Sequence, residues 1–144
     1  MSYAVILILA ILGGIAIVVQ GQFMGLLAQN LGPLESIFIT YLGGFLLAAI
    51  ALLIHQGGNL KAWPTMPWYT LTSGFLGLVI IGVIGYVVPR LGLATGFTVI
   101  VAAQFICSVI IDHYGFLGVM VRPFDVPRLL GLGLVMAGVT LMVR

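Results

Sequence analysis

Charged side chains are scarce in this sequence. They make up 6% of the 144 residues, with five Lys and Arg against three Asp and Glu. Soluble proteins carry about 25% charged residues. Because 62% of the residues are hydrophobic, a soluble domain of this length could not bury them all. The composition therefore predicts an integral membrane protein, and so few basic residues exclude a nucleic-acid-binding surface.

Cysteine and recognisable catalytic groups are also lacking. The single cysteine, Cys107, lies in an apolar run and excludes a disulfide framework or a cysteine metal cluster, so we interpret it as a packing residue. The two histidines, His55 and His113, are far apart and show no metal-ligand spacing. No serine, cysteine or histidine has a base partner at a recognisable spacing. The sequence therefore predicts no enzyme, no metal site and no cofactor.

Long apolar runs account for most of the chain. They cover about residues 3–28, 34–54, 68–88, 91–111 and 126–143. Each is long enough to cross a bilayer as a helix. The first run lacks the basic residues that precede a secretory signal, so we interpret it as a retained membrane helix. The predicted fold class is all-α, with five transmembrane helices in a single membrane domain of residues 1–144.

Basic residues are almost balanced between the two sides of the membrane. With five spans, the side of the N-terminus carries Lys61, Arg122 and Arg128, and the opposite side carries Arg90 and Arg144. Orientation is set mainly by an excess of Lys and Arg in short loops. So small an excess favours a chain that inserts in both orientations; the alternative is that the loop with Arg122 and Arg128 lies in the cytoplasm. A chain that inserts both ways can form an antiparallel homodimer, which supplies the inverted repeats of many transporters.

The polar residues inside the predicted spans are neutral. No charged residue falls near the middle of a span, which argues against a carboxylate-centred cation site. Neutral groups there either bond neighbouring helices or bind a polar substrate. We expect Gln20 and Gln104 to face a cavity, because an amide in lipid needs a partner or water. The candidate substrate-binding residues are Gln20, Gln22, Tyr41, Tyr86, Gln104 and Ser108.

Acidic residues occur only near the ends of the predicted helices. Glu35 either complements the positive end of the helix dipole at the start of residues 34–54 or serves as a proton-coupling site, for which it is the candidate. Asp112 and His113 fall at the last turn of the fourth helix, where an acid opposes the negative helix end and needs a partner. We predict that Arg122 or Arg128 is this partner. These residues then form a structural latch between the fourth and fifth helices, which we favour over a proton relay.

Two segments carry a recognisable family pattern: residues 89–118, PRLGLATGFTVIVAAQFICSVIIDHYGFLG, and residues 122–142, RPFDVPRLLGLGLVMAGVTLM. The matching features are Pro89-Arg90-Leu91-Gly92, Gln104, Asp112-His113 with an aromatic residue and Gly115, Arg122-Pro123, Arg128 with Gly131 and Gly138, and, in the first helix, Gln20 and Leu31-Gly32-Pro33. The chain resembles the YdcZ-type family of the drug/metabolite transporter superfamily over nearly its whole length. One departure is Met24, where the family pattern often has asparagine; Gln22 is then an alternative contact.

The resemblance implies a multi-pass exporter of five helices in the bacterial inner (cytoplasmic) membrane. It also implies an antiparallel homodimer or a paired heterodimer, with a cavity among the first four helices of each half. We therefore predict a secondary transporter of an unknown small molecule, with the lipid bilayer and a second copy of the chain as partners. A passive small-ion channel built on the same plan, and a subunit that needs a paralogous partner, stay open as alternatives.

Overall fold

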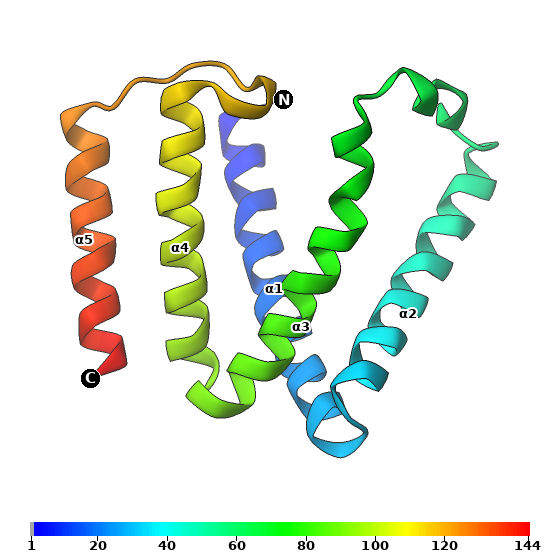
Figure 1. The fold of residues 1–144 in the computed structure, drawn as a ribbon, viewed down its shortest axis with the longest axis horizontal. Coiled ribbons are helices and arrows are strands. Elements are labelled where there is room, and N and C mark those ends of the chain that lie inside the picture. Colours follow the sequence, from blue (N-terminus) through cyan, green and yellow to red (C-terminus); the bar gives the residue numbers. More distant parts are fainter. Residues whose placement is uncertain (1) are drawn as a thin grey trace. The chain divides into compact units, whose positions relative to one another are not determined.

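A computed structural model describes residues 2–144, and it is helical throughout (Figure 1). The five long helices are α1 (Tyr3–Asn30), α2 (Pro33–Ile54), α3 (Ser73–Leu91), α4 (Leu93–Tyr114) and α5 (Val126–Val143). Short 3₁₀ segments lie between them, at Leu60–Thr65, Trp68–Thr72 and Phe116–Gly118. Residues 2–144 include no strand, so the predicted all-α class is confirmed.

The C-terminal ends of α3 and α4 differ from the predicted ones for an identifiable reason. The fourth apolar run ends at Ile111, but α4 continues to Tyr114, where Gly115 takes up the left-handed conformation with a φ of 67°. A glycine in this conformation ends a helix, whereas a change to polar residues does not. Similarly, α3 passes Pro89 and ends at Leu91, before Gly92 with a φ of 81°. The backbone of the following glycine, and not the loss of hydrophobicity, therefore decides both ends.

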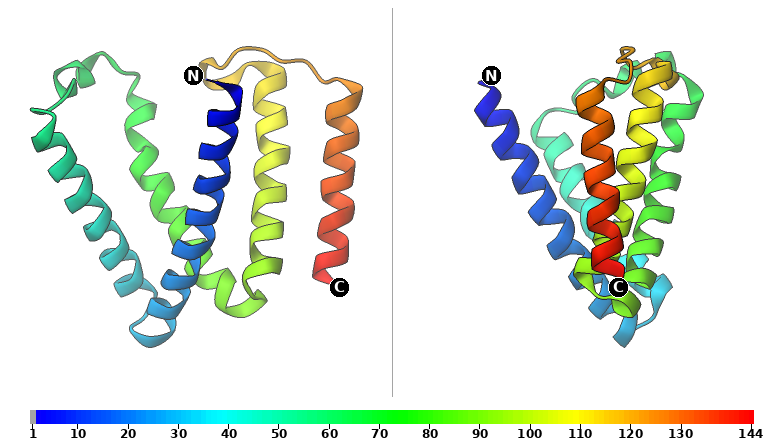
Figure 2. Two further views of the ribbon diagram at one scale, coloured as in Figure 1. Left: turned by 180° about the vertical axis from the view of Figure 1, so that it is seen from behind. Right: turned by 90° about the vertical axis from the view of Figure 1, so that its left-hand side faces the viewer.

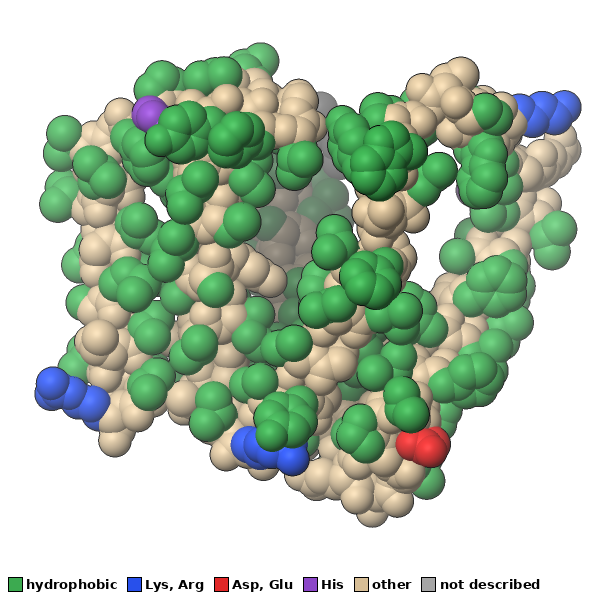
Figure 3. Space-filling model, in the orientation of Figure 1, with side chains coloured by type: hydrophobic (Ala, Val, Ile, Leu, Met, Phe, Trp, Pro, Cys, Tyr) green, Lys and Arg blue, Asp and Glu red, His purple; other side chains and the backbone are tan. Residues whose placement is uncertain are grey.

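All five helices are long and apolar enough to cross a membrane, if the preceding turn Trp68–Thr72 is counted with α3. Figure 3 shows hydrophobic side chains along the flanks of the helices, while the Lys, Arg, Asp and Glu side chains on this face lie at helix ends and in loops. An exterior of this kind is favourable only in lipid, where each helix satisfies its own backbone hydrogen bonds. The prediction of a multi-pass membrane protein is therefore confirmed.

The chain divides into two compact units, residues up to Arg90 and residues from Leu91 to Arg144. In the first unit, a tight turn at Leu31 and Gly32 joins α1 to α2, and the two helices pack against each other near this turn. A buried hydrogen bond joins them, because the Ser36 hydroxyl donates to the Met24 carbonyl oxygen at 3.0 Å. The third helix joins this unit through Tyr41, whose hydroxyl donates to the Gly74 carbonyl oxygen at 3.3 Å.

The second unit is an antiparallel pair of helices. The helices α4 and α5 pack side by side, as Figures 1 and 2 show, and residues 115–125 connect them. Asp125 caps α5, since its Oδ1 accepts a hydrogen bond from the Arg128 N–H at 2.9 Å. The Thr95 hydroxyl also donates to the Met142 carbonyl oxygen at 3.3 Å, which ties the opposite ends of the two helices together.

Candidate functional site

One candidate site is a groove between α4 and α5. It has a volume of about 490 Å³. Its walls are apolar except at one end, where Ser108, Asp112 and Arg128 gather. The lining residues are Phe105, Ser108, Val109 and Asp112 of α4 and Arg128, Gly131, Leu132 and Val135 of α5. Spacings of three, four and seven residues place each set on one face of its helix. We call this feature the α4–α5 groove.

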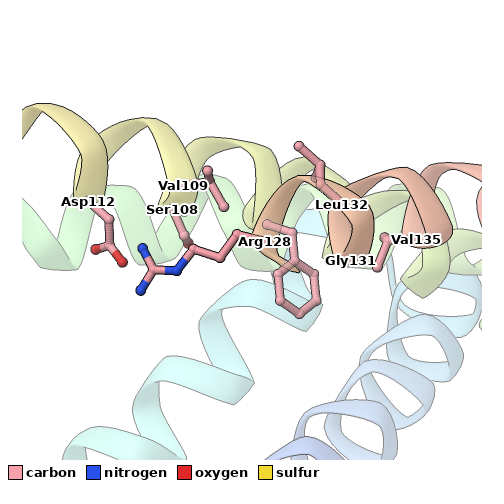
Figure 4. A pocket seen from close by; sticks show the side chains of 8 residues that line it. Ser108, Val109, Asp112, Arg128, Gly131, Leu132 and Val135 are labelled. Atoms are coloured by element: carbon pink, nitrogen blue, oxygen red, sulfur yellow. The ribbon is translucent and has the colours of Figure 1, made fainter. Parts of the chain in front are cut away.

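The charged end of the α4–α5 groove is built from two helix ends. Asp112 lies in the last turn of α4 and Arg128 in the first turn of α5. Figure 4 shows the Arg128 guanidinium pointing toward the Asp112 carboxylate. Arg128 forms an ion pair with Asp125, whose Oδ1 lies 4.0 Å from Nε of Arg128. The guanidinium also donates from Nη1 to the Arg122 carbonyl oxygen at 3.2 Å, so most of its five donors stay available.

The loop before α5 is fastened to the end of α4 mainly through backbone groups. The Arg122 N–H donates to the Asp112 carbonyl oxygen at 2.8 Å. The Phe124 N–H donates to Nδ1 of His113 at 3.2 Å, and the rings of His113 and Phe124 lie 4.3 Å apart. The predicted latch residues are thus brought together around this loop. Their role as a latch stays a prediction, now with these specific contacts to test.

Two of the predicted substrate-binding residues, Gln104 and Ser108, are adjacent on α4. The Ser108 hydroxyl donates to the Gln104 carbonyl oxygen at 2.7 Å, and Ser108 lines the α4–α5 groove. Gln104 does not line that groove, and its side chain is exposed. On α1, Gln20 is exposed and Gln22 is half-buried. Within residues 2–144, none of these three glutamine side chains has a hydrogen-bond partner.

The two predicted tyrosines lie in different surroundings within the first unit. Tyr41 connects α2 to α3 through Gly74, as described above. Tyr86 lines a separate cavity of about 460 Å³, together with Gln29 and Arg90. The Arg90 guanidinium stacks on the Tyr86 ring at 3.5 Å from its centroid and donates from Nη1 to the Tyr86 carbonyl oxygen at 2.8 Å. The predicted substrate-binding residues therefore occupy several places, divided between the two units.

Glu35 lies in the first turn of α2 and its side chain is exposed. Its carboxylate folds back over Gly32. The two are so close that a Cβ added to this glycine would meet Oε2 of Glu35. Around it is a shallow depression of about 390 Å³ with apolar walls that include Leu31 and Phe38. This place at the start of a helix suits an acid electrostatically and also leaves it accessible.

Sequence reasoning missed several structural partners. The Ser36–Met24 bond joins two helices, but a serine near a helix start and a methionine within an apolar run give no sign that they meet. Gln29 reaches the cavity of Tyr86 and Arg90 although it lies at the end of α1. The apolar wall residues of the α4–α5 groove lie in long apolar runs, in which the sequence does not show which residues line a groove. Gly131 was the one residue whose small size indicated free space there. Within residues 2–144, no group of three or more His, Cys, Asp or Glu residues gathers as metal ligands would.

Comparison with known proteins gives one informative match. The sequence model of the family described as "Putative inner membrane exporter, YdcZ" matches residues 5–141. Neither the curated proteins nor the solved structures contain a match to the chain. The match covers nearly the whole chain and all five apolar helices, which places the protein in the inner membrane as a multi-pass protein. The chain therefore belongs to the YdcZ family of inner membrane exporters.

Proposed function

We propose that the protein is a secondary transporter that exports a small molecule across the inner membrane. Two copies in opposite orientations form the transporting unit and alternate between inward-open and outward-open states. Family membership supports export as the coarse function. The more specific proposal, a transporter made of two copies, rests on the side-chain amides of two glutamines in membrane-spanning helices.

Gln20 and Gln104 lie well within α1 and α4, and both side chains are exposed in a single copy. Within residues 2–144, neither amide has a hydrogen-bond partner. An unsatisfied amide in hydrocarbon costs several kcal/mol. These amides therefore need either a water-filled cavity or groups from a second copy. A transporter made of two copies around a central cavity provides both.

The balance of basic residues supports the opposite orientation of the two copies. Lys61, Arg122 and Arg128 stand against Arg90 and Arg144 on the two sides of a five-span chain. This difference of one residue gives a weak orientation signal. An interface with two-fold symmetry is also the commonest geometry of homo-oligomers.

Orientation-locked variants test the antiparallel arrangement. Asn59→Lys with Met66→Lys adds two positive charges to the loop between α2 and α3, and Asn30→Lys with Leu91→Lys adds two to the opposite side. Each pair should fix one orientation, whereas wild type should show both when cytoplasm-active and periplasm-active reporters follow Arg144. Each locked variant alone should be inactive, and co-expression of the two should restore transport. Activity of one locked variant by itself would refute the antiparallel unit.

A flux screen in proteoliposomes over small cations, anions and zwitterions tests transport itself. Wild-type flux should saturate with concentration and respond to a proton gradient. Unsaturated flux near the diffusion rate, without counter-transport, would instead indicate a channel. If the single chain moves nothing until a paralogous chain is added, the homodimer is wrong.

The role of Gln104 has a separate test. Gln104→Ala should leave assembly intact and reduce the flux of a compound that the screen shows to be transported. The expected reduction is roughly tenfold, which corresponds to the loss of one hydrogen bond to the substrate. Thr140→Val is the matched control, because the Thr140 hydroxyl already donates to the Ala137 carbonyl oxygen of its own helix. Equal flux in both variants would show that Gln104 only packs.

Glu35 is the acid that we propose for proton coupling. The chain has three acidic residues, of which Asp125 caps α5 and Asp112 lies in the α4–α5 groove. The third, Glu35, is exposed at the start of α2. Glu35→Gln should retain substrate exchange without a gradient but lose acceleration by a proton gradient. Full acceleration in this variant would assign coupling elsewhere.

A further inference from the structure

The α4–α5 groove combines a polar end with apolar walls, and this combination suggests its own ligand. Asp112 and Arg128 lie close to the ends of two membrane helices, where a bilayer changes from hydrocarbon to headgroup. From there the groove continues along α4 and α5 between side chains that include Phe105 and Leu132. Its volume of about 490 Å³ is in the usual range for sites that bind small amphipathic molecules. A ligand that matches it has a charged head and a hydrocarbon chain.

The charges at the polar end define the head. Arg128 has guanidinium donors beyond the one that it gives to Arg122, and guanidinium groups pair well with phosphate. Asp112 is half-buried and, within residues 2–144, its carboxylate accepts no hydrogen bond. It can therefore accept hydrogen bonds from an ammonium group. Asp125, whose Oδ1 lies 4.0 Å from Nε of Arg128, is outside the groove lining, so the lining holds one acid and one base. This pair favours a zwitterion over an ion of either sign.

We propose that the α4–α5 groove binds a zwitterionic phospholipid with a primary amine in its headgroup, of the phosphatidylethanolamine type. The phosphate pairs with Arg128 and the ammonium group donates to Asp112. One acyl chain lies along the apolar walls, in the space left by the missing side chain of Gly131. This proposal does not depend on the proposed transport function, and it holds whether or not the chain transports a substrate.

The geometry at Gly131 supports a chain in the groove and also supplies a test. A Cβ added to Gly131 has no neighbour within 4 Å, so the groove is open at this position of α5. A larger side chain at this position starts in open space and fills part of the groove. Gly133 is also open by the same measure but does not line the groove. Gly131→Leu and Gly133→Leu are therefore a matched pair that differ in whether they fill the groove.

The charge of Asp112 can be removed without breaking the loop. Its contact with Arg122 uses the main-chain carbonyl oxygen of Asp112, at 2.8 Å, and not the carboxylate. Asp112→Asn keeps that contact and the size of the side chain. It removes only the negative charge that recognises the ammonium group.

The experiment uses the purified full chain, delipidated in detergent, and native mass spectrometry with three lipids of the same acyl chains. These are phosphatidylethanolamine, phosphatidylcholine, whose quaternary ammonium cannot donate hydrogen bonds, and phosphatidylglycerol, which has no ammonium. Wild type should bind phosphatidylethanolamine about tenfold tighter than the other two, since one charge-assisted hydrogen bond is worth about that much. Asp112→Asn should lose this preference. Gly131→Leu should lose binding of all three lipids, and Gly133→Leu should bind as wild type does.

Three results would overturn the proposal. Equal binding of the three lipids to wild type would show that the headgroup is not recognised. Wild-type affinity in Gly131→Leu, with helical content retained by circular dichroism, would place the lipid elsewhere. A change in oligomeric state in Gly131→Leu without any change in lipid binding would show that the groove receives a helix of a second copy.

Discussion

The hydroxyl of Ser36 provides the sharpest test of how the first unit is held together. Ser36 is 1% exposed and donates to the Met24 carbonyl oxygen at 3.0 Å across the α1–α2 hairpin. Ser36→Ala removes this bond. We expect the free energy of unfolding to fall by about 1 kcal/mol, between the average of about 0.6 and the maximum of about 1.7 measured for hydrogen bonds between membrane helices.

Two structural facts determine that magnitude. Burial of Ser36 keeps water from replacing the lost partner, which places the cost above the average. The Met24 carbonyl oxygen is not left unsatisfied, because the helical pattern of α1 pairs it with the N–H of Ala28. The cost therefore stays below that of a buried, orphaned polar group. About 1 kcal/mol corresponds to roughly a fivefold change in the folding equilibrium.

Equilibrium unfolding in mixed micelles, with an increasing fraction of a denaturing detergent, measures this change. Both tryptophans, Trp63 and Trp68, belong to the same unit as Ser36, so their fluorescence follows its unfolding. Thr40→Val is the control on the same helix, since the Thr40 hydroxyl donates at 2.8 Å to the carbonyl oxygen of Ser36 within α2. It should change stability by less than about 0.5 kcal/mol. Equal losses in Ser36→Ala and Thr40→Val would refute a stabilising bond between helices.

The other predictions concern close contacts and the loop before α5. Gly77→Ala should destabilise the first unit by about 1 kcal/mol in wild type but not in Tyr41→Phe, because the added Cβ at position 77 would meet the Tyr41 hydroxyl. Equal effects in both backgrounds, measured by the same micelle titration, would show that this contact is absent. His113→Leu should accelerate amide exchange at Phe124, whose N–H donates to the imidazole at 3.2 Å; an unchanged exchange rate would show that the loop is held otherwise. Gly115→Ala should lower the free energy of unfolding by about 1 to 2 kcal/mol, because the φ of Gly115 is 67°, a left-handed conformation that is unfavourable for alanine. A variant as stable as wild type would contradict this.

Some parts of the candidate site could be predicted because they depend on chemical type and position along a helix. Asp112 was expected to have Arg122 or Arg128 as its partner, since an acid in the last turn of a helix opposes the negative helix end and both arginines lie on the same side of the membrane. The α4–α5 groove could not be predicted, because it depends on which faces of α4 and α5 meet. In chains as uniformly apolar as these, hydrophobic periodicity does not reveal that face. Ser108 was predicted as a substrate contact, and only the structure places it at the polar end of the groove.

By itself, the sequence determined the class of this protein. Transfer of apolar helices into lipid is an additive property of local composition, so five runs of sufficient length specify five spanning helices whatever their neighbours. The family pattern over residues 5–141 is likewise a property of the linear chain. The tertiary structure decided which side chains meet, as with Ser36 and the Met24 carbonyl, or Tyr41 and Gly74. Lipid provides little hydrophobic drive between helices, so these pairings come from the fit of small residues and single hydrogen bonds, which appear only when the helices are packed.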